Sequence, residues 1–598
     1  MNPRTRDQRL QAWYRHARIG LFVHWGMLTG EHAADPAGPD LSYPYVTPDA
    51  FETAAVQAGW NAQRWVDTAK RLRAKYLTVA TFHCDLGYLK IWPSQIPGSP
   101  CTQRDYLQEL IDATSAEGIR LLLYITRAAD HAHHGGVQWL DRAAYCRYKA
   151  DDSVDLTTSA GFLTYTLDVI EEVLATHPGI DGLWFDGYHD PEEAQTVFSH
   201  IHRLRSDLIL VRNNFGMSPV ADEDAMSLED WGKVCDPAYD FAGATWVAPG
   251  DKEFAFKTKA DWFYLGDGHP EWSTYALNYQ HEPDNATIVR RILTIAGTSW
   301  NAHLGYGPKI GGDFPKSLES FTEHFDRFMS WAQESIYGTV GGGYGEGGFP
   351  PGWWNDGAHG VTTMVPDQSI HYLHVLSAPR SRHLVVPDRG YRVTGAWLLK
   401  SGRALSWKQS RGELTIALPF WDDVDLDGAI IIKVTTAEAL NLVPAADITV
   451  LEGSTVSEHP AVHWFNGDYD SYFQSSDGPW PKSLTMRLGT PQNLSGLCVL
   501  QPETGPVRPG GYRSPPNERI REYQVHVSQN GVQWGNPVVH GELRNQRGLQ
   551  VIRFDPVPAA YLRFSVLNNY GRTQTFKLIR VDLMVASSAD ENGGFSRD

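Results

Sequence analysis

The sequence predicts an α/β barrel followed by two all-β domains, and three observations support this prediction. The chain has 598 residues, several times what one hydrophobic core usually organises, so two to four domains are expected. Its first ~340 residues alternate short apolar runs with amphipathic segments, which is typical of parallel strands wrapped in helices. Beyond a Gly/Pro-rich stretch at Gly341–Pro351, every expected element is a strand.

Apolar, β-branched runs predict the strands of the barrel, which we expect at Leu21–Trp25, Tyr76–Phe82, Arg120–Thr126, Gly182–Tyr188 and Leu208–Asn214. Between these runs the apolar residues recur at helical spacing, for example at Trp65, Ala69 and Leu72. This alternation of strand and helix favours a (β/α)8 barrel over residues 1–345.

The second half of the chain predicts antiparallel β-structure. Short alternating runs separated by turns lie at His371–Ser377, Leu384–Val386, Val393–Leu399, Leu414–Leu418 and Ala429–Val434. We expect one β-sandwich over residues 346–442 and a second over residues 443–598.

Composition limits the kinds of molecule that the protein is expected to bind and the compartment in which it is expected to work. A formal net charge of -18 argues against nucleic acid, and no run of about 18 apolar residues could span a membrane. The five cysteines lack CxxC spacing and are expected to be free thiols of a reducing compartment. The first residues lack the apolar core of a signal peptide, so we expect a cytoplasmic protein, or a secreted one if a leader was removed. The oligomeric state stays open.

Polar residues close the predicted barrel strands, at the end where barrel enzymes carry their catalytic groups. His24, His83 and Asp186 each follow an apolar run in this way. A buried aspartate is costly unless its charge is used. Asp186, beside Trp184, therefore predicts a glycosidase nucleophile, and the alternative is a carboxylate that caps the next helix or pairs with an arginine.

Glycoside hydrolysis needs a second carboxyl group as the proton donor. Position alone offers Glu229, Asp251 and Glu253, all in the region where the chain should return to the mouth of the barrel. Each of them could equally be a surface carboxylate, the usual environment of such side chains.

Three segments together resemble glycoside hydrolase family 29, the α-L-fucosidases. They are WYRHARIGLFVHWG (Trp13–Gly26), NAQRWVDTAKRLRAKYLTVATFH (Asn61–His83) and GIDGLWFDG (Gly179–Gly187). The resemblance implies a retaining, exo-acting hydrolase that releases terminal α-L-fucose from oligosaccharides. It also implies that Asp186 is the nucleophile and that His24 and His83 bind the sugar.

The resemblance also ranks the candidate proton donors. Family members carry the acid/base glutamate nine or ten residues before an aromatic segment, and Glu253 has this spacing to Trp262. Glu229 resembles an upstream T-P-E motif instead and is the runner-up. The Trp-Phe-Tyr segment that begins at Trp262 is similar to the subgroup acting on branched α-1,3/1,4-linked fucose.

Further sugar contacts follow from the same resemblance. Glu31 matches a sugar-binding glutamate of that subgroup, and Tyr124 and Trp262 are expected in the pocket. Trp25 or Trp184 would provide an apolar floor for the sugar ring.

One departure concerns the glycone. The family usually has two adjacent histidines after the second strand, whereas this chain has His83 followed by Cys84. A thiol is a poor substitute for imidazole as a hydrogen-bonding group. L-Galactose, which is fucose with a 6-hydroxyl group, is therefore an alternative glycone.

The last domain resembles a discoidin-like (F5/8 type C) carbohydrate-binding module, through FNGDYDSYF (Phe465–Phe473), TMRLG (Thr485–Gly489) and REYQVHVSQNGVQW (Arg521–Trp534). Such modules often hold a structural calcium ion, and no other cofactor is expected. Zinc at His131, His133 and His134 is disfavoured, because no cysteine or carboxylate completes a recognised spacing.

Two further interpretations stay open. The chain could be a non-catalytic carbohydrate-binding protein with an inactive barrel, although the presence of both Asp186 and Glu253 argues against it. Transglycosylation would use the same catalytic residues as hydrolysis and is equally compatible with the sequence.

Overall fold

The structure is a computed structural model. It describes residues 13–14, 16–27, 29, 45–127, 129, 138–213, 220, 222–229, 250–255, 285–297, 301–341, 360–365, 367, 369–376, 382–387, 391–410, 413–419, 427–437, 442–452, 460–461, 473–501, 519–543, 548–571, 573–578 and 580–586. The chain divides into two compact units, one built around the first 234 residues and the other containing everything from Glu334 onward.

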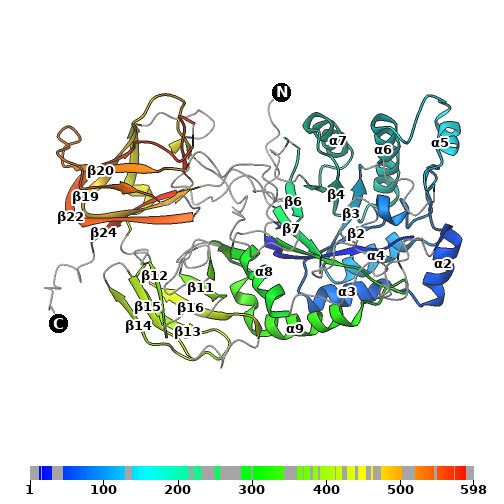
Figure 1. Cartoon of the computed structure of the whole chain (residues 1–598), viewed down its shortest axis with the longest axis horizontal. Coiled ribbons are helices and arrows are strands. Elements are labelled where there is room, and N and C mark those ends of the chain that lie inside the picture. The colour runs from blue at the N-terminus through cyan, green and yellow to red at the C-terminus, as the bar shows by residue number, and fades with distance from the viewer. Residues whose placement is uncertain are drawn as a thin grey trace. The chain divides into compact units, whose positions relative to one another are not determined.

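The first unit is a closed parallel barrel, as the sequence predicted (Figure 1). Its strands are β1 (Ile19–His24), β2 (Tyr76–Ala80), β3 (Arg120–Thr126), β4 (Gly182–Asp186), β5 (Ile209–Asn213), β6 (Ala225–Glu229), β7 (Gly250–Ala255) and β8 (Asn301–Tyr306). Each strand pairs in parallel with the next, and β8 pairs with β1 to close the ring.

Large apolar side chains fill the interior of the barrel. Phe22, Tyr124, Trp184 and Val211, from four different strands, belong to one buried cluster there. Strands β1, β2 and β5 are buried at every position, because one face meets this interior and the other meets the helices. The polar ends of the strands therefore rest on a packed core.

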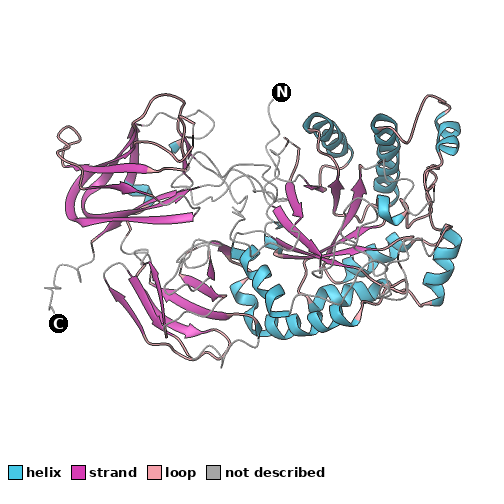
Figure 2. Ribbon diagram, in the orientation of Figure 1, coloured by secondary structure: helices cyan, strands magenta, loops and turns pink. Residues whose placement is uncertain are grey.

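Helices surround these strands (Figure 2). They are α2 (Pro48–Gln57), α3 (Ala62–Arg71), α4 (Tyr106–Ala116), α5 (Arg142–Lys149), α6 (Ser159–Thr176), α7 (Pro191–Leu204), α8 (Asn285–Gly297) and α9 (Lys316–Ala332). Local sequence fixes where α7 begins: Asp190 accepts hydrogen bonds from two backbone N–H groups of the first turn, and Pro191 follows it. The turn after β4 is thereby anchored just beyond Asp186.

The second unit holds antiparallel β-structure in two stretches of the chain. In the first stretch, one sheet contains β9 (Val340–Gly341), β10 (Gly360–Met364), β11 (Ile370–Val375), β13 (Val393–Leu398) and β16 (Ile430–Thr436). The other sheet contains β12 (His383–Pro387), β14 (Trp407–Ser410) and β15 (Glu413–Ala417). Leu373, Leu384 and Ile416 belong to one core shared by both sheets, which makes this region a sandwich.

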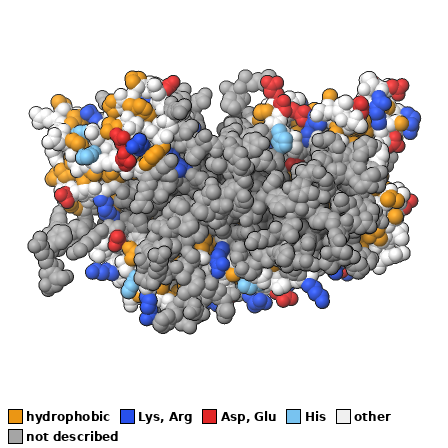
Figure 3. All heavy atoms as spheres, in the orientation of Figure 1, with side chains coloured by type: hydrophobic (Ala, Val, Ile, Leu, Met, Phe, Trp, Pro, Cys, Tyr) orange, Lys and Arg blue, Asp and Glu red, His pale blue; other side chains and the backbone are white. Residues whose placement is uncertain are grey.

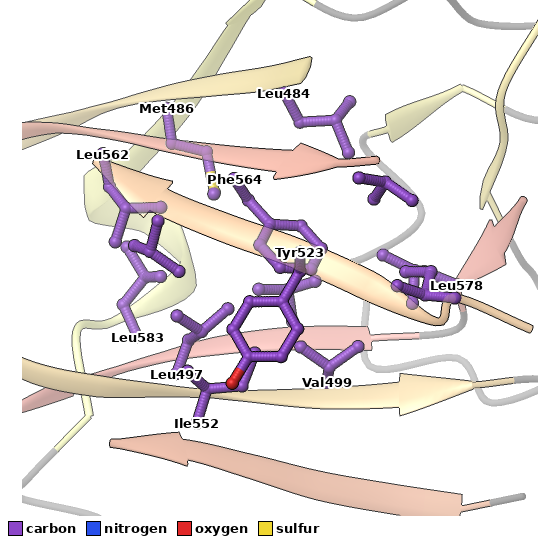
Figure 4. Packing of buried hydrophobic residues seen from close by; sticks show 14 of the residues in the cluster. Leu484, Met486, Leu497, Val499, Tyr523, Ile552, Leu562, Phe564, Leu578 and Leu583 are labelled. Carbon is purple, nitrogen blue, oxygen red and sulfur yellow. The ribbon is translucent and has the colours of Figure 1, made fainter. Parts of the chain in front are cut away.

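The second stretch forms another all-β module. Its main sheet contains β17 (Ile448–Glu452), β19 (Lys482–Gln501), β20 (Glu522–Ser528), β21 (Val539–Glu542), β22 (Gly548–Val566) and β24 (Arg580–Val585), and β18 (Phe473–Gln474) pairs with β23 (Lys577–Leu578). Alternate residues such as Leu484, Met486 and Phe564 point into one core, shown in Figure 4. A barrel followed by β-sandwich structure is thus confirmed.

The surface and the helices add two observations. On the face drawn in Figure 3, acidic and basic side chains of the described residues lie interspersed among apolar ones. Within the part of the chain that the structure describes, none of the helices is both long and apolar enough to cross a bilayer.

Candidate active site

The carboxyl ends of β1 to β5 bring the predicted polar residues to one end of the barrel. His24 closes β1, Asp186 closes β4 and Asn213 closes β5, while His83 follows β2 after a short bend. Because parallel strands of a closed barrel end on the same side, these side chains converge at its mouth.

Asp186 is held from two sides. The Tyr124 hydroxyl, from β3, donates to its Oδ2 at 2.7 Å, and the Asn213 amide, from β5, donates to its Oδ1 at 3.0 Å. Hydrogen bonds to an ionised carboxylate are stronger than those between neutral groups. The arrangement therefore fixes the carboxylate with two uncharged donors.

Tyr124 is suited to be a donor. Burial, together with the neighbouring Asp186 carboxylate, raises the pKa of Tyr124 well above its usual value. The phenol thus keeps its proton at neutral pH and can only donate it to Asp186 as a hydrogen bond. The sequence predicted Tyr124 as a sugar contact, and in the structure its hydroxyl bonds the nucleophile candidate.

The two predicted sugar-binding histidines lie beside this pair. The ring centroids of His24 and His83 are 5.9 Å apart, and those of His83 and Tyr124 are 5.1 Å apart. Burial lowers the pKa of His24 well below its usual value, and His83 and His303 lower it further. His24 is therefore a neutral imidazole, with one nitrogen that donates and one that accepts hydrogen bonds, as hydroxyl groups require.

Cys84, where the family usually has a second histidine, also lies at this site. Its Sγ is 3.7 Å from Nδ1 of His83, within the first residues of a 3-10 turn at Cys84–Leu86. Its side chain is buried. The thiol therefore contacts the imidazole next to it instead of lying on the surface.

The two tryptophans predicted as a floor have different surroundings. Trp184 is buried inside the barrel and stacks on the Tyr124 ring at 5.2 Å. Trp25 is enclosed by the rings of Phe51, Trp60, Trp65 and Tyr106, and its indole N–H donates to the Ile310 carbonyl. Trp25 therefore packs among aromatic rings, and its contact with the sugar stays a prediction.

The candidate acid/base residues are described only through their backbones. Glu229 ends β6, Glu253 lies in β7, and the strand register pairs them with each other. Asp251, two residues earlier in β7, pairs with Ser227. The choice between Glu253 and Glu229 stays a prediction. Glu31 and Trp262, with the histidines at 131, 133 and 134, lie outside the described residues.

His303 is a buried residue of this barrel that the prediction of the site did not include. It lies in β8, and its ring stacks on Phe22 at 4.4 Å with an interplanar angle of 2°. Burial lowers the pKa of His303 to about 3, so the side chain is neutral. A histidine in the middle of an apolar run gave no sequence signal that distinguished a packed core residue from a functional one.

Potential metal ligands are scattered over the part of the chain that the structure describes. Among those residues, no group of three or more His, Cys, Asp or Glu side chains could hold a metal ion. The calcium expected for the last module remains a prediction, because most of Phe465–Phe473 lies outside the described ranges.

Comparison with solved structures supports the fold. Alpha-L-fucosidase isoenzyme 1 from Paenibacillus thiaminolyticus is 21% identical, with a TM-score of 0.51 over 72% of this chain and 99% of that one. An alpha-L-fucosidase of glycoside hydrolase family 29 from Bacteroides thetaiotaomicron is 18% identical, with a TM-score of 0.53 over 73% of this chain and 98% of that one.

Sequence similarity extends to a curated protein and to two family models. A galactose oxidase from Gibberella zeae is 25% identical over 117 residues, which is 20% of this chain, and the chain spans only 16% of the length of that curated relative. The family model for F5/8 type C domains matches residues 451–579. The family model for alpha-L-fucosidases matches residues 2–334, which include all eight barrel strands. The chain therefore belongs to the alpha-L-fucosidase family.

Proposed function

We propose that this protein is a retaining, exo-acting glycoside hydrolase that releases terminal α-L-fucose, or a close analogue, from oligosaccharides. The observation that carries the proposal is the environment of Asp186. Its carboxylate ends β4 at the mouth of the barrel, held by Tyr124 on one side and Asn213 on the other. A nucleophile needs such a fixed, ionised oxygen within reach of the anomeric carbon.

In the first step, an Asp186 oxygen attacks C1 of the sugar and the bond from C1 to the leaving oxygen breaks. Glu253, with Glu229 as the alternative, donates its proton to the leaving oxygen. In the second step, the same glutamate takes a proton from water, whose oxygen attacks C1 and releases Asp186. Two displacements at one carbon return the original configuration. The Bacteroides thetaiotaomicron fucosidase, similar in fold, is known as a trapped covalent intermediate, and this supports a covalent step.

The imidazoles of His24 and His83 would bind sugar hydroxyls beside the nucleophile. Their hydrogen bonds would strengthen as positive charge develops on the sugar ring. Trp184, below Tyr124, would close the base of the pocket. Branched α-1,3/1,4-linked fucose is the preferred substrate class, on the resemblance of the segment around Trp262.

L-Galactose remains the second candidate glycone. Cys84 beside His83 favours it, because a thiol is smaller than imidazole and leaves more room for a 6-hydroxyl group. The F5/8 type C module would bind a polymeric or branched glycan, and a structural calcium ion in that module belongs to the same proposal.

The nucleophile assignment is tested with Asp186→Asn. Turnover of aryl α-L-fucoside should fall more than about 1,000-fold, because the amide is a far poorer nucleophile than the carboxylate. Asp181→Asn is the matched control, since Asp181 flanks the other end of β4 and pairs with Arg120 at 2.8 Å. This control should remain active.

Covalent labelling locates the reactive carboxylate directly. A 2-deoxy-2-fluoro-fucosyl fluoride should modify Asp186 in the wild-type protein, as read by peptide mass spectrometry. A label on another residue, or a product of inverted configuration, would contradict the proposal. Release from aryl α-L-galactoside in preference to the fucoside would select the second glycone, and sugar binding without release from either would favour an inactive barrel.

A further inference from the structure

We infer that Asn213 is a positioning residue for the nucleophile, holding one oxygen of Asp186 in place while Tyr124 holds the other. The inference rests on the proposed function, because it deepens the role given there to Asp186. Asn213 was predicted only as part of the strand Leu208–Asn214.

The register of β4 and β5 places Asn213 next to Asp186 on the neighbouring strand. Phe185 in β4 pairs with Arg212 in β5, so the residues that follow them, Asp186 and Asn213, lie side by side. The Asn213 side chain is fully buried, and its Nδ2 donates to Oδ1 of Asp186 at 3.0 Å. A buried amide on a rigid strand loses little further freedom when it makes this bond.

The two donors lie on the two strands that flank β4. Tyr124 comes from β3 and Asn213 from β5, so the Asp186 side chain is tied to both adjacent strands. Rotation of the carboxylate about its Cβ–Cγ bond would move both oxygens and break both hydrogen bonds. Correct alignment of a nucleophile provides a large part of the reduction in the activation free energy. A displacement of about 1 Å can lower the rate on the order of 100-fold.

Both described donors are uncharged, which matters for reactivity. A hydrogen bond to the ionised form favours ionisation, yet an amide or phenol does not neutralise the negative charge as a cation would. Each carboxylate oxygen can accept more than one hydrogen bond, so lone pairs remain for attack on C1. Asn213 therefore orients the nucleophile without neutralising its charge.

The test uses Asn213→Ala and the isosteric Asn213→Asp in the full-length chain. Loss of a hydrogen bond to a charged group should slow labelling of Asp186 by the 2-deoxy-2-fluoro donor by about 10- to 100-fold. The acidic limb of the kcat/KM profile should move to higher pH in Asn213→Asp, because two carboxyl groups about 3 Å apart cannot both ionise freely.

Ser227→Ala is the matched control. Ser227 pairs with Asn213 in the register of β5 and β6, and it is equally buried. It makes none of the hydrogen bonds to Asp186 that the described residues provide. The control should therefore leave the acidic limb where it is in the wild-type protein, and circular dichroism should confirm that every variant is folded.

Three outcomes would overturn the inference: an unmoved acidic limb in Asn213→Asp, an unchanged labelling rate in folded Asn213→Ala, or an equal move in Ser227→Ala. If Asn213→Ala does not fold, the isosteric Asn213→Asp decides alone. Failure of the proposed function looks different, since then the wild-type protein would not be labelled at Asp186 at all.

Discussion

At the scale of single residues, Cys84 contacts His83, one of the two histidines expected to bind the sugar. The Cys84 Sγ is 3.7 Å from the imidazole Nδ1. A thiol is a weak donor, and an imidazole nitrogen is a good acceptor. If the thiol donates, Nδ1 is the acceptor and Nε2 carries the hydrogen, so His83 presents an N–H to a sugar hydroxyl.

We therefore expect Cys84→Ala to lower kcat/KM for the preferred aryl glycoside by about 3- to 10-fold, the value of one neutral hydrogen bond. Cys84→Ser should keep most of the activity, because a hydroxyl can donate to the same nitrogen. Steady-state kinetics in a double-mutant cycle provide the measurement. In the His83→Ala background Cys84→Ala should have little further effect, and equal losses in both backgrounds would sink the coupling.

Sequence reasoning can propose single site residues but not the residues that contact them. Asp186 and His24 were predicted because a charged or polar residue that closes a buried strand needs a reason to be there. The bond from Asn213 to Asp186 was not predicted, since distances between strands are absent from the sequence. The aromatic enclosure of Trp25 was not predicted either, because a tryptophan that packs against other rings and one that stacks on sugar look the same in a sequence.

At the scale of elements, a buried ion pair secures the connection from β5 to β6. The Arg212 guanidinium contacts the Glu223 carboxylate at 2.8 Å, and both side chains are fully buried. Arg212 also donates to the Tyr188 carbonyl just after β4, and Glu223 accepts from the Val220 N–H. The pair therefore ties the ends of the strands that carry Asp186 and Asn213.

Glu223→Gln should destabilise the barrel by about 3 kcal/mol, because it removes the carboxylate charge that faces the buried Arg212 guanidinium. Chemical denaturation, followed by tryptophan fluorescence, measures this loss. Asp207→Asn is the control: Asp207 is 65% exposed and pairs with Arg205, so its loss should cost less than about 1 kcal/mol. Similar losses in the two variants would show that burial does not strengthen the Arg212–Glu223 pair.

Elements differ in how well the sequence predicts them. Strands β1 to β5 were predicted because each is a continuous apolar run of the kind that a two-sided buried sheet requires. Strands β6, β7 and β8 were not, since AMSLE, GDKEFA and NAHLGY contain no β-branched residue. Barrel closure through the neighbouring strands imposes their conformation, and this tertiary effect has no local signal.

At the scale of the whole molecule, each of the two units contains a buried histidine that should make its folded state less stable in acid. His303 lies in the barrel, and His374 lies in β11 with its Nε2 3.0 Å from the Thr363 hydroxyl. Burial lowers the pKa of both to about 3, from the usual 6.5. Each side chain is therefore neutral in the folded protein at a pH where the unfolded chain would bind a proton.

The sign of the effect follows from proton counting. Below about pH 6.5 the unfolded state takes up a proton at His374 and the folded state does not, so stability falls as the pH falls towards 3. Between pH 7 and pH 5 this one histidine should remove about 2 kcal/mol from the free energy of unfolding of its unit. At pH 8 the residue is neutral in both states and contributes no pH dependence.

His374→Gln tests this at the scale of one unit. Urea unfolding at pH 8, 7 and 5 should show that the variant loses about 2 kcal/mol less than the wild-type protein on acidification, whatever its stability at pH 8. Only the transition of the β-sandwich unit should respond, since the barrel keeps its own buried histidine. A parallel fall in both proteins would mean that His374 is already charged in the folded state, and that the acid response of this unit comes from other titratable groups, such as the buried His371.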